Sequence, residues 1–152
     1  MRVSFCIPTH DGNARCQNYL FDIFHALSQQ INKDFNVWIS DHSKSDKVLT
    51  ACKEYADLFE INYVRNPNNL GNISANTNHS LRNADGEILK VLFSDDFILT
   101  NNLVAELDKS FTDDVKWAVT GYAHTVDDGQ THYNPKVPFY NDRLLEGVNT
   151  LS

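Results

Sequence analysis

Short apolar runs alternate with stretches of helical periodicity over the first 120 residues of the chain. Runs rich in branched and aromatic residues predict strands, and apolar residues recurring every three or four positions predict helices. The predicted strands are 3–7, 35–40, 61–64, 88–93 and 115–120, and the predicted helices are 17–30, 47–59, 74–83 and 103–111. Such alternation predicts an α/β fold, with a mostly parallel sheet flanked by helices.

Local signals set the boundaries of these elements. Pro8 is expected to close the first strand because it has no N–H to donate to a ladder. Asp46 is expected to cap the second helix, and Asn101 or Asn102 the fourth. The run 88–93 has a single polar residue, Lys90, which suits a strand buried on both faces. The third helix is rich in Asn, a poor helix former, so its polar side is expected to have another task.

Beyond Gly121 the pattern changes. Segments 122–126 and 130–133, joined through Asp127-Asp128-Gly129, predict a short β excursion. Residues 134–152 show no strong periodicity, and no convincing linker divides the chain. We therefore expect residues 1–152 to form a single domain.

Polar residues follow each of the first four predicted strands. They are Pro8-Thr9-His10-Asp11, Asp41, the segment 66–71 and Asp95-Asp96. In open parallel sheets, ligands bind outside the carboxyl ends of the strands. The sequence thus predicts that four segments, far apart along the chain, share one ligand-binding edge.

Asp95 and Asp96 are two adjacent carboxylates at the end of a strand. Neighbouring carboxylates raise each other's cost of ionisation unless a positive charge lies close to them. A hard cation such as Mn²⁺ or Mg²⁺ would remove that cost, and such ions are commonly held by one or two carboxylates together with substrate phosphates. The alternative is a solvated turn, in which Asp is common.

Composition narrows the class of protein. Hydrophobic residues at 41% and charged residues at 22% are ordinary for a globular domain, whereas a net charge of −7 argues against a nucleic-acid partner. The three cysteines have no CxxC spacing, so neither a disulfide framework nor a zinc site is indicated. No apolar run approaches the ~20 residues that span a bilayer, and no signal peptide is evident, so the expected location is cytoplasmic.

The stretch 3–98 resembles the nucleotide-sugar-binding half of family 2 glycosyltransferases, which have the Rossmann-like GT-A fold. The matching pieces, in order, are Ser4 to Thr9, Phe35 to Asp46, Asn69-Leu70-Gly71 with Asn76 and Asn78, Ala84 to Glu87, and Ser94-Asp95-Asp96. Each piece is short, but the pieces occur in the order and spacing of the family, and together they extend over about two thirds of the chain.

The resemblance implies a metal-dependent, inverting transfer of sugar from a nucleotide-diphosphate sugar to an acceptor. The residues implied for the nucleotide sugar are Pro8, Thr9, His10, Asp41, Asn69, Gly71, Asn76, Asn78 and Asp95, with Asp96 as ligand of Mn²⁺ or Mg²⁺. In this assignment Asp41 contacts the base, and the Asn and Gly positions line the ribose and diphosphate.

This sequence departs from the family pattern at several positions. His10-Asp11 replaces the usual pair after Pro-Thr, and His42 replaces the acid that normally follows Asp41. The acceptor-binding half is expected to be short or missing, so the catalytic base is unassigned. The alternative function is a non-catalytic or truncated nucleotide-sugar-binding module, and a purely structural α/β domain is a third reading. A glycan, lipid or protein acceptor, peripheral membrane association and the oligomeric state are all left open.

Overall fold

The computed structural model describes residues 1–12, 14–120, 124–125 and 132–133. Residues Met1–Lys116 form one compact unit, and Trp117–Ser152 form a second. The expectation of a single domain stays a prediction. The four-stranded sheet and the candidate site lie within the first unit.

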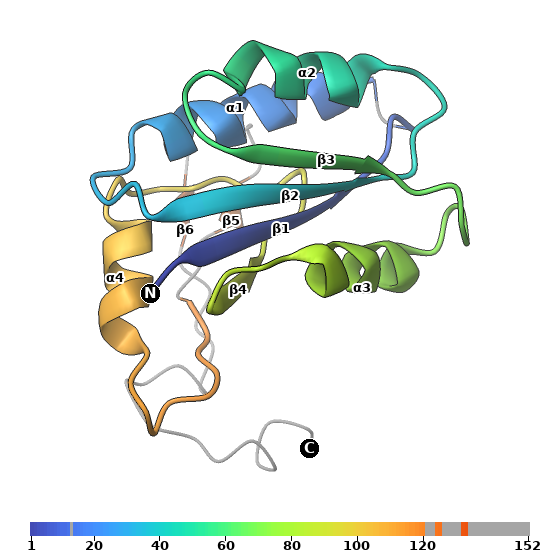
Figure 1. The fold of residues 1–152 in the computed structure, drawn as a ribbon. Coiled ribbons are helices and arrows are strands. Elements are labelled where there is room, and N and C mark those ends of the chain that lie inside the picture. Colours follow the sequence, from blue (N-terminus) through green and yellow to red (C-terminus); the bar gives the residue numbers. More distant parts are fainter. Residues whose placement is uncertain (13, 121–123, 126–131, 134–152) are drawn as a thin grey trace. The chain divides into compact units, whose positions relative to one another are not determined.

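A four-stranded parallel sheet forms the centre of the first unit (Figure 1). Its strands are β1 Val3–Thr9, β2 Phe35–Asp41, β3 Ile61–Arg65 and β4 Ile88–Val91. They lie in the order β3-β2-β1-β4, and each pairing is parallel. The predicted α/β class with a parallel sheet is confirmed, and β1 and β2 are the inner strands, completely or almost completely buried.

Helices cover both faces of this sheet (Figure 1). They are α1 Cys16–Ser28, α2 Lys47–Tyr55, α3 Ile73–Asn83 and α4 Leu103–Ser110. Helices α1 and α2 pack together over one face, and α3 lies against β1 and β2 on the other. The apolar residues of β1 and β2 bury against Leu20, Ile23, Phe24 and Leu27 of α1, so the periodicity that predicts the helix also predicts its buried side.

The prediction that Pro8 ends the first strand is wrong, because β1 continues to Thr9, which pairs with Asp41. The carbonyl of Cys6 accepts from the amide of Leu92, so this side of β1 faces β4. Pro8 lies two residues further on the same side, beyond the last paired residue of β4, Val91. Its missing N–H therefore costs no ladder hydrogen bond.

Two other strand predictions need correction. The run 88–93 is not buried on both faces: β4 ends at Val91, and Leu89 and Phe93 are 43% and 39% exposed. Within the described residues β4 pairs with β1 alone, so it lies at an edge. Residues 115–120 form no strand, although their composition is typical of one. Strand propensity is realised only where a partner strand supplies hydrogen bonds, and no described strand pairs with this segment.

The predicted caps are partly correct. Asp46 and Asn102 occupy the N-cap positions of α2 and α4, but neither side chain makes a capping hydrogen bond. The Asp46 carboxylate instead accepts from Arg65 at 2.8 Å. The helix that uses a side-chain cap is α3, where the side chain of Asn72 accepts from the amide of Ala75 at 3.0 Å.

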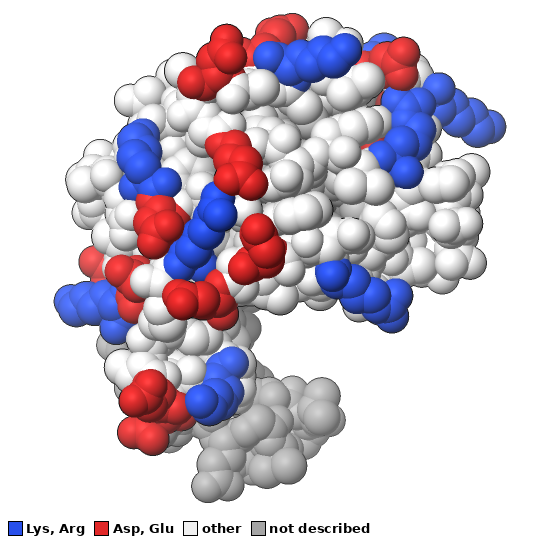
Figure 2. All heavy atoms as spheres, viewed as in Figure 1, with Lys and Arg blue, Asp and Glu red and all other residues white. Residues whose placement is uncertain are grey.

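In the second unit, β5 His124–Thr125 pairs with β6 His132–Tyr133 in an antiparallel arrangement. These pairs confirm the predicted excursion where it is described; its tip at 126–131 lies outside the described residues. Among the described helices, none combines the length and apolarity needed to cross a bilayer. Acidic and basic side chains alternate on the face that Figure 2 presents.

Candidate functional site

A pocket of about 410 Å³ opens at the carboxyl ends of β1 and β4, beside the start of α3. Its lining residues come from five separate segments of the first unit. They are Pro8, Thr9, His10, Cys16, Tyr19, His42, Gly71, Ile73, Asn76, Phe93, Ser94 and Asp95. The pocket therefore lies where the strand-end rule places a ligand.

Six of the residues predicted for a ligand line this pocket. They are Pro8, Thr9, His10, Gly71, Asn76 and Asp95. The other four, Asp41, Asn69, Asn78 and Asp96, are not among its lining residues, and their predicted contacts stay predictions. Asn69 and Asn78 are exposed, while Asp41 is completely buried.

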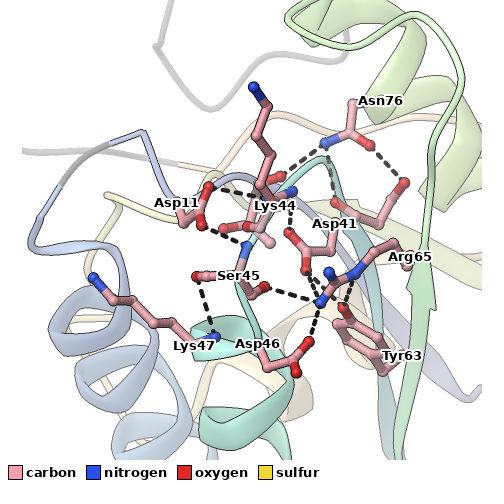
Figure 3. A network of polar contacts seen from close by, with 12 residues as sticks. Asp11, Asp41, Lys44, Ser45, Asp46, Lys47, Tyr63, Arg65 and Asn76 are labelled. Carbon is pink, nitrogen blue, oxygen red and sulfur yellow. Dashed lines mark hydrogen bonds and ion pairs between the residues drawn. The ribbon is translucent and has the colours of Figure 1, made fainter.

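Asp41 lies at the end of β2 with its carboxylate turned into the protein (Figure 3). One carboxylate oxygen accepts from the amide of Ser43 at 2.7 Å, and the other accepts from the hydroxyl of Tyr63 at 2.7 Å. The guanidinium of Arg65 lies 3.8 Å away. A buried charge needs such partners, and here they come from the protein itself.

Arg65 connects the ends of β3 and the loop before α2 (Figure 3). Its guanidinium donates to the hydroxyl of Tyr63, the carbonyl of Ser45 and the carboxylate of Asp46. Burial raises the pKa of Tyr63 to about 12, and its hydrogen bond to Asp41 adds to the shift. The phenol therefore stays protonated and keeps donating to Asp41 over the whole neutral range.

Asp11 fastens the loop after β1 to the loop after β2 (Figure 3). Its carboxylate accepts from the backbone amides of Ser45 at 2.9 Å and Lys44 at 3.3 Å. Hydrogen bonds from the Ser45 hydroxyl and then its amide lower the Asp11 pKa from 3.8 to about 2. Asp11 thus holds together two loops that contribute residues to the pocket wall.

Asn76 has all four hydrogen-bonding positions of its amide in use. The nitrogen donates to the carbonyls of Thr9 at 3.1 Å and Ser40 at 3.0 Å. The oxygen accepts from the hydroxyl of Ser40 at 2.6 Å and from the side chain of Asn66 at 3.3 Å. The task expected for an Asn-rich helix is therefore, at this position, to hold α3 against the strand ends.

The turn before α3 gives that helix an open amino end at the pocket. Asn69 and Gly71 have positive φ angles of 55° and 81°, a conformation open to Gly and, among other residues, best tolerated by Asn and Asp. Asn72 then caps the helix, and Gly71 and Ile73 line the pocket. The amino end of a helix favours negative charge, which suits a phosphate group.

Asp95 and Asp96 lie in the turn after β4, and both are exposed. Asp96 accepts from the amide of Phe93 at 2.9 Å. Desolvation of part of its carboxylate raises the Asp96 pKa, and Asp95 adds to the rise, while the Phe93 hydrogen bond and Lys90 oppose it. No cluster of three or more acidic, His or Cys side chains able to hold a metal is found in the described residues. Two carboxylates do fit an ion whose remaining ligands are phosphate oxygens and water.

Three buried side-chain polar atoms of the described residues have no hydrogen-bond partner: Thr9 Oγ1, His42 Nε2 and Ser43 Oγ. All three belong to the ends of β1 and β2, and the carbonyl of Thr9 accepts from the amide of His42 at 2.9 Å. Thr9 and His42 line the pocket. An unpaired buried polar group costs about 1–3 kcal/mol, so the fold carries this cost at the strand ends that flank the pocket.

The sequence did not lead us to predict His42 as a site residue. His42 directly follows Asp41 at the end of a strand, so the rule that ligands bind at the carboxyl ends of parallel strands would have identified it. Five other lining residues were not predicted either: Cys16, Tyr19, Ile73, Phe93 and Ser94. Ser94 adjoins the predicted acids, and Ile73 adjoins Gly71. Cys16 and Tyr19 lie on the first turn of α1, and no sequence signal separates them from core residues.

A parallel α/β sheet with a pocket at its carboxyl edge, lined by a glycine-containing turn and by an acid after β4, is the arrangement expected of a GT-A domain. The model of the family described as "Glycosyl transferase family 2" matches residues 4–150, and the chain belongs to this family of glycosyltransferases. The predicted family and fold are thereby confirmed. No curated protein matches the chain.

Solved structures show the same fold. TarS of S. aureus superposes with a TM-score of 0.62 at 22% identity, over 72% of this chain and 19% of that chain. TarS 1-349 in complex with UDP-GlcNAc gives 0.59 at 23% identity, over 72% and 30%. The mannosyltransferase PcManGT from Pyrobaculum calidifontis, in complex with GDP-Man and Mn²⁺, gives 0.57 at 21% identity, over 71% and 31%. The chain spans less than a third of each of these proteins.

Proposed function

We propose that this domain binds a nucleotide-diphosphate sugar in the pocket at the carboxyl edge of the sheet and transfers the sugar to an acceptor. The observation that carries the proposal is the pocket at the carboxyl edge of the sheet, whose lining brings together the end of β1, the turn before α3 and Asp95 after β4. Family membership supports the reaction class. The complexes of TarS with UDP-GlcNAc and of PcManGT with GDP-Man and Mn²⁺ support the class of donor.

In this proposal the ligand lies across three parts of the pocket wall. The base lies against the ends of β1 and β2, near Pro8, Thr9 and His10. The diphosphate lies at the open amino end of α3, where Gly71 permits close approach of the backbone and the helix favours negative charge. The ribose or sugar reaches Asp95, which lines the pocket after the end of β4.

Asp96, with Asp95 beside it, would hold Mn²⁺ or Mg²⁺ together with the diphosphate. When bound, such an ion stabilises the negative charge that develops on the leaving nucleotide. The chain's own contribution is positional: Asp11 and Asn76 fix the loops and the helix that surround the pocket, so the donor is bound in one orientation. An inverting outcome, the acceptor class and the cytoplasmic location stay predictions.

Isothermal titration of the 152-residue chain with UDP and with GDP, each in Mn²⁺ and in EDTA, tests the proposal. We expect metal-dependent binding of at least one nucleotide. A chain that binds neither of them, with or without metal, would refute it.

A binding module without turnover is the second candidate. The pocket lining favours it. Of the described residues that line the pocket, Asp95 alone carries a carboxylate, so the lining offers no second acid that could deprotonate an acceptor. Release of nucleotide from donor sugars, measured with and without acceptors, separates the candidates. Turnover that Asp96→Asn abolishes would exclude the module, whereas tight binding without turnover would support it.

A further inference from the structure

The acid turn, residues 93–96, is closed by its own hydrogen bonds. The amide of Asp96 donates to the carbonyl of Phe93 at 3.0 Å, and the carboxylate of Asp96 accepts from the amide of Phe93 at 2.9 Å. Both bonds lie within the turn. They fix its shape, whereas its position in the molecule depends on the contacts made before and after it.

On its amino side the acid turn is attached to the sheet through β4. The last residue pair between β4 and β1 is Val91 with Cys6, and the amide of Leu92 then donates to the carbonyl of Cys6 at 3.1 Å. In the described residues β4 is paired on one side alone, so the chain enters the acid turn from an edge strand. An edge strand leaves part of its backbone groups without ladder partners, and it therefore restrains the turn that follows less than an inner strand would.

On its carboxyl side the acid turn is attached to α1 through two aromatic rings. Phe97 directly follows Asp96, and its ring meets the ring of Tyr19 edge to face, with ring centroids 6.5 Å apart and ring planes at 85°. Aromatic pairs favour this geometry. Tyr19 lies on the first turn of α1, where its amide donates to the carbonyl of Arg15 at 3.1 Å. Tyr19 also lines the pocket, as Asp95 does.

We propose that Tyr19 and Phe97 are positioning residues, which hold the acid turn in the conformation that binds a divalent metal ion with a nucleotide diphosphate. This inference rests on the proposed function. Helix α1 is a firm support for the ring of Tyr19, because Leu20 and Ile23 of the same helix are 0% exposed in the core. A turn that is ordered before its ligand arrives binds that ligand more tightly, since binding does not have to order it.

Variants of the two rings test the proposal. Tyr19→Leu and Phe97→Leu each remove the ring contact and keep an apolar side chain, so each should weaken Mn²⁺-dependent binding of UDP or GDP about three- to tenfold. Binding of the nucleotide in EDTA should fall less. Tyr19→Phe keeps the ring and lacks the hydroxyl, so it should recover the affinity that Tyr19→Leu loses. Free Mn²⁺, followed by its electron paramagnetic resonance in titrations of the 152-residue chain with each nucleotide, gives these affinities.

A second aromatic pair of α1 provides the matched control. Tyr55 of α2 contacts Phe21 of α1 with ring centroids 6.1 Å apart, and Tyr55 also contacts Phe24 and Phe59. Tyr55 does not line the pocket. Tyr55→Leu should therefore lower Tm at least as much as Tyr19→Leu does, and it should leave the Mn²⁺ affinity unchanged. A general loosening of the fold would instead weaken Mn²⁺ binding in both variants.

Combining the two changes shows whether the rings act as a pair. Once Tyr19→Leu has removed the contact, Phe97→Leu has no ring contact left to remove. The double variant should therefore bind Mn²⁺ about as well as the weaker single variant, and the two effects should not multiply. Because the two rings belong to different elements, each single variant also gives the comparison with Tyr55→Leu by itself if the other does not fold.

The outcomes separate this inference from the proposed function. Unchanged Mn²⁺ affinity in Tyr19→Leu and Phe97→Leu, an equal loss in Tyr19→Phe, an equal loss in Tyr55→Leu, or independent effects in the double variant would each overturn the positioning role and leave nucleotide binding intact. Nucleotide binding that does not depend on Mn²⁺ would overturn it as well. Failure of both nucleotides to bind, with or without Mn²⁺, would remove both proposals.

Discussion

The side-chain amide of Asn76 donates a hydrogen bond of 3.1 Å to the backbone carbonyl of Thr9. This bond joins the first half of α3 to the last residue of β1, although two helices and two strands lie between them in the chain. Since Asn76 is buried and its amide is fully used, it acts as a structural clamp at the edge of the pocket.

Asn76→Ala should destabilise the fold strongly. The change removes four hydrogen bonds and leaves the carbonyls of Thr9 and Ser40 with fewer buried partners, so we expect a loss of about 3 kcal/mol in the free energy of unfolding, measured with urea. Asn78→Ala, on the exposed side of the same helix, should change it by less than about 0.5 kcal/mol. Similar losses for both variants would contradict the clamp.

Gly86→Ala should destabilise the chain through a direct clash. An added Cβ would lie 2.5 Å from Ser4 Oγ and 2.7 Å from the Ser4 backbone nitrogen, and the backbone cannot move aside cheaply. We expect a loss of about 2–3 kcal/mol in the free energy of unfolding. Gly71→Ala provides the comparison: its Cβ would meet no atom within 4 Å, so the positive φ alone should cost about 1 kcal/mol. The prediction is wrong if Gly86→Ala proves the milder of the two.

Asp11 should contribute to stability in a defined range of pH. Its pKa is lowered by folding, from 3.8 to about 2, so its stabilising effect is complete above about pH 5 and is lost as the pH falls from about 4 to 2. Asp11→Asn should be less stable by about 1 kcal/mol at pH 7, with allowance for solvent screening, and the difference should vanish near pH 2. Urea unfolding at a series of pH values measures this. Asp22→Asn, on the exposed side of α1, serves as control at pH 7.

Removal of the carboxylate at Asp96 should separate metal binding from folding. Asp96 is exposed and its internal contact is a hydrogen bond with the amide of Phe93, so Asp96→Asn should fold normally. We expect Mn²⁺-dependent affinity for a nucleotide diphosphate to fall at least tenfold, while any binding seen in EDTA is unchanged. Free Mn²⁺ can be followed by its electron paramagnetic resonance. Unaltered Mn²⁺ dependence would show that Asp96 is not a metal ligand.

Local patterns predicted most of the fold correctly because strands, helices and turns are selected largely by nearby residues. The strands of the sheet, the helix carrying Leu20 and Phe24, and the family pieces ending at Asp96 were all evident in the sequence. The errors occurred where pairing with a neighbouring strand decides whether a segment forms a strand and where that strand ends. The segment 115–120 has strand composition without a described partner, and Pro8 is tolerated in β1 because β4 ends before reaching it.

By itself the sequence determined which segments carry polar residues at strand ends, since that depends on periodicity along the chain. Only the tertiary structure decided what each residue does there. Asn76 and Asn78 look alike in sequence, yet one is a buried clamp and the other is exposed. The Asp41 carboxylate turns toward Tyr63, and the unpaired Nε2 of His42 is left beside the pocket. The reason is that hydrogen-bond partners come from strands and loops far away in sequence, and the sheet register alone brings them within reach.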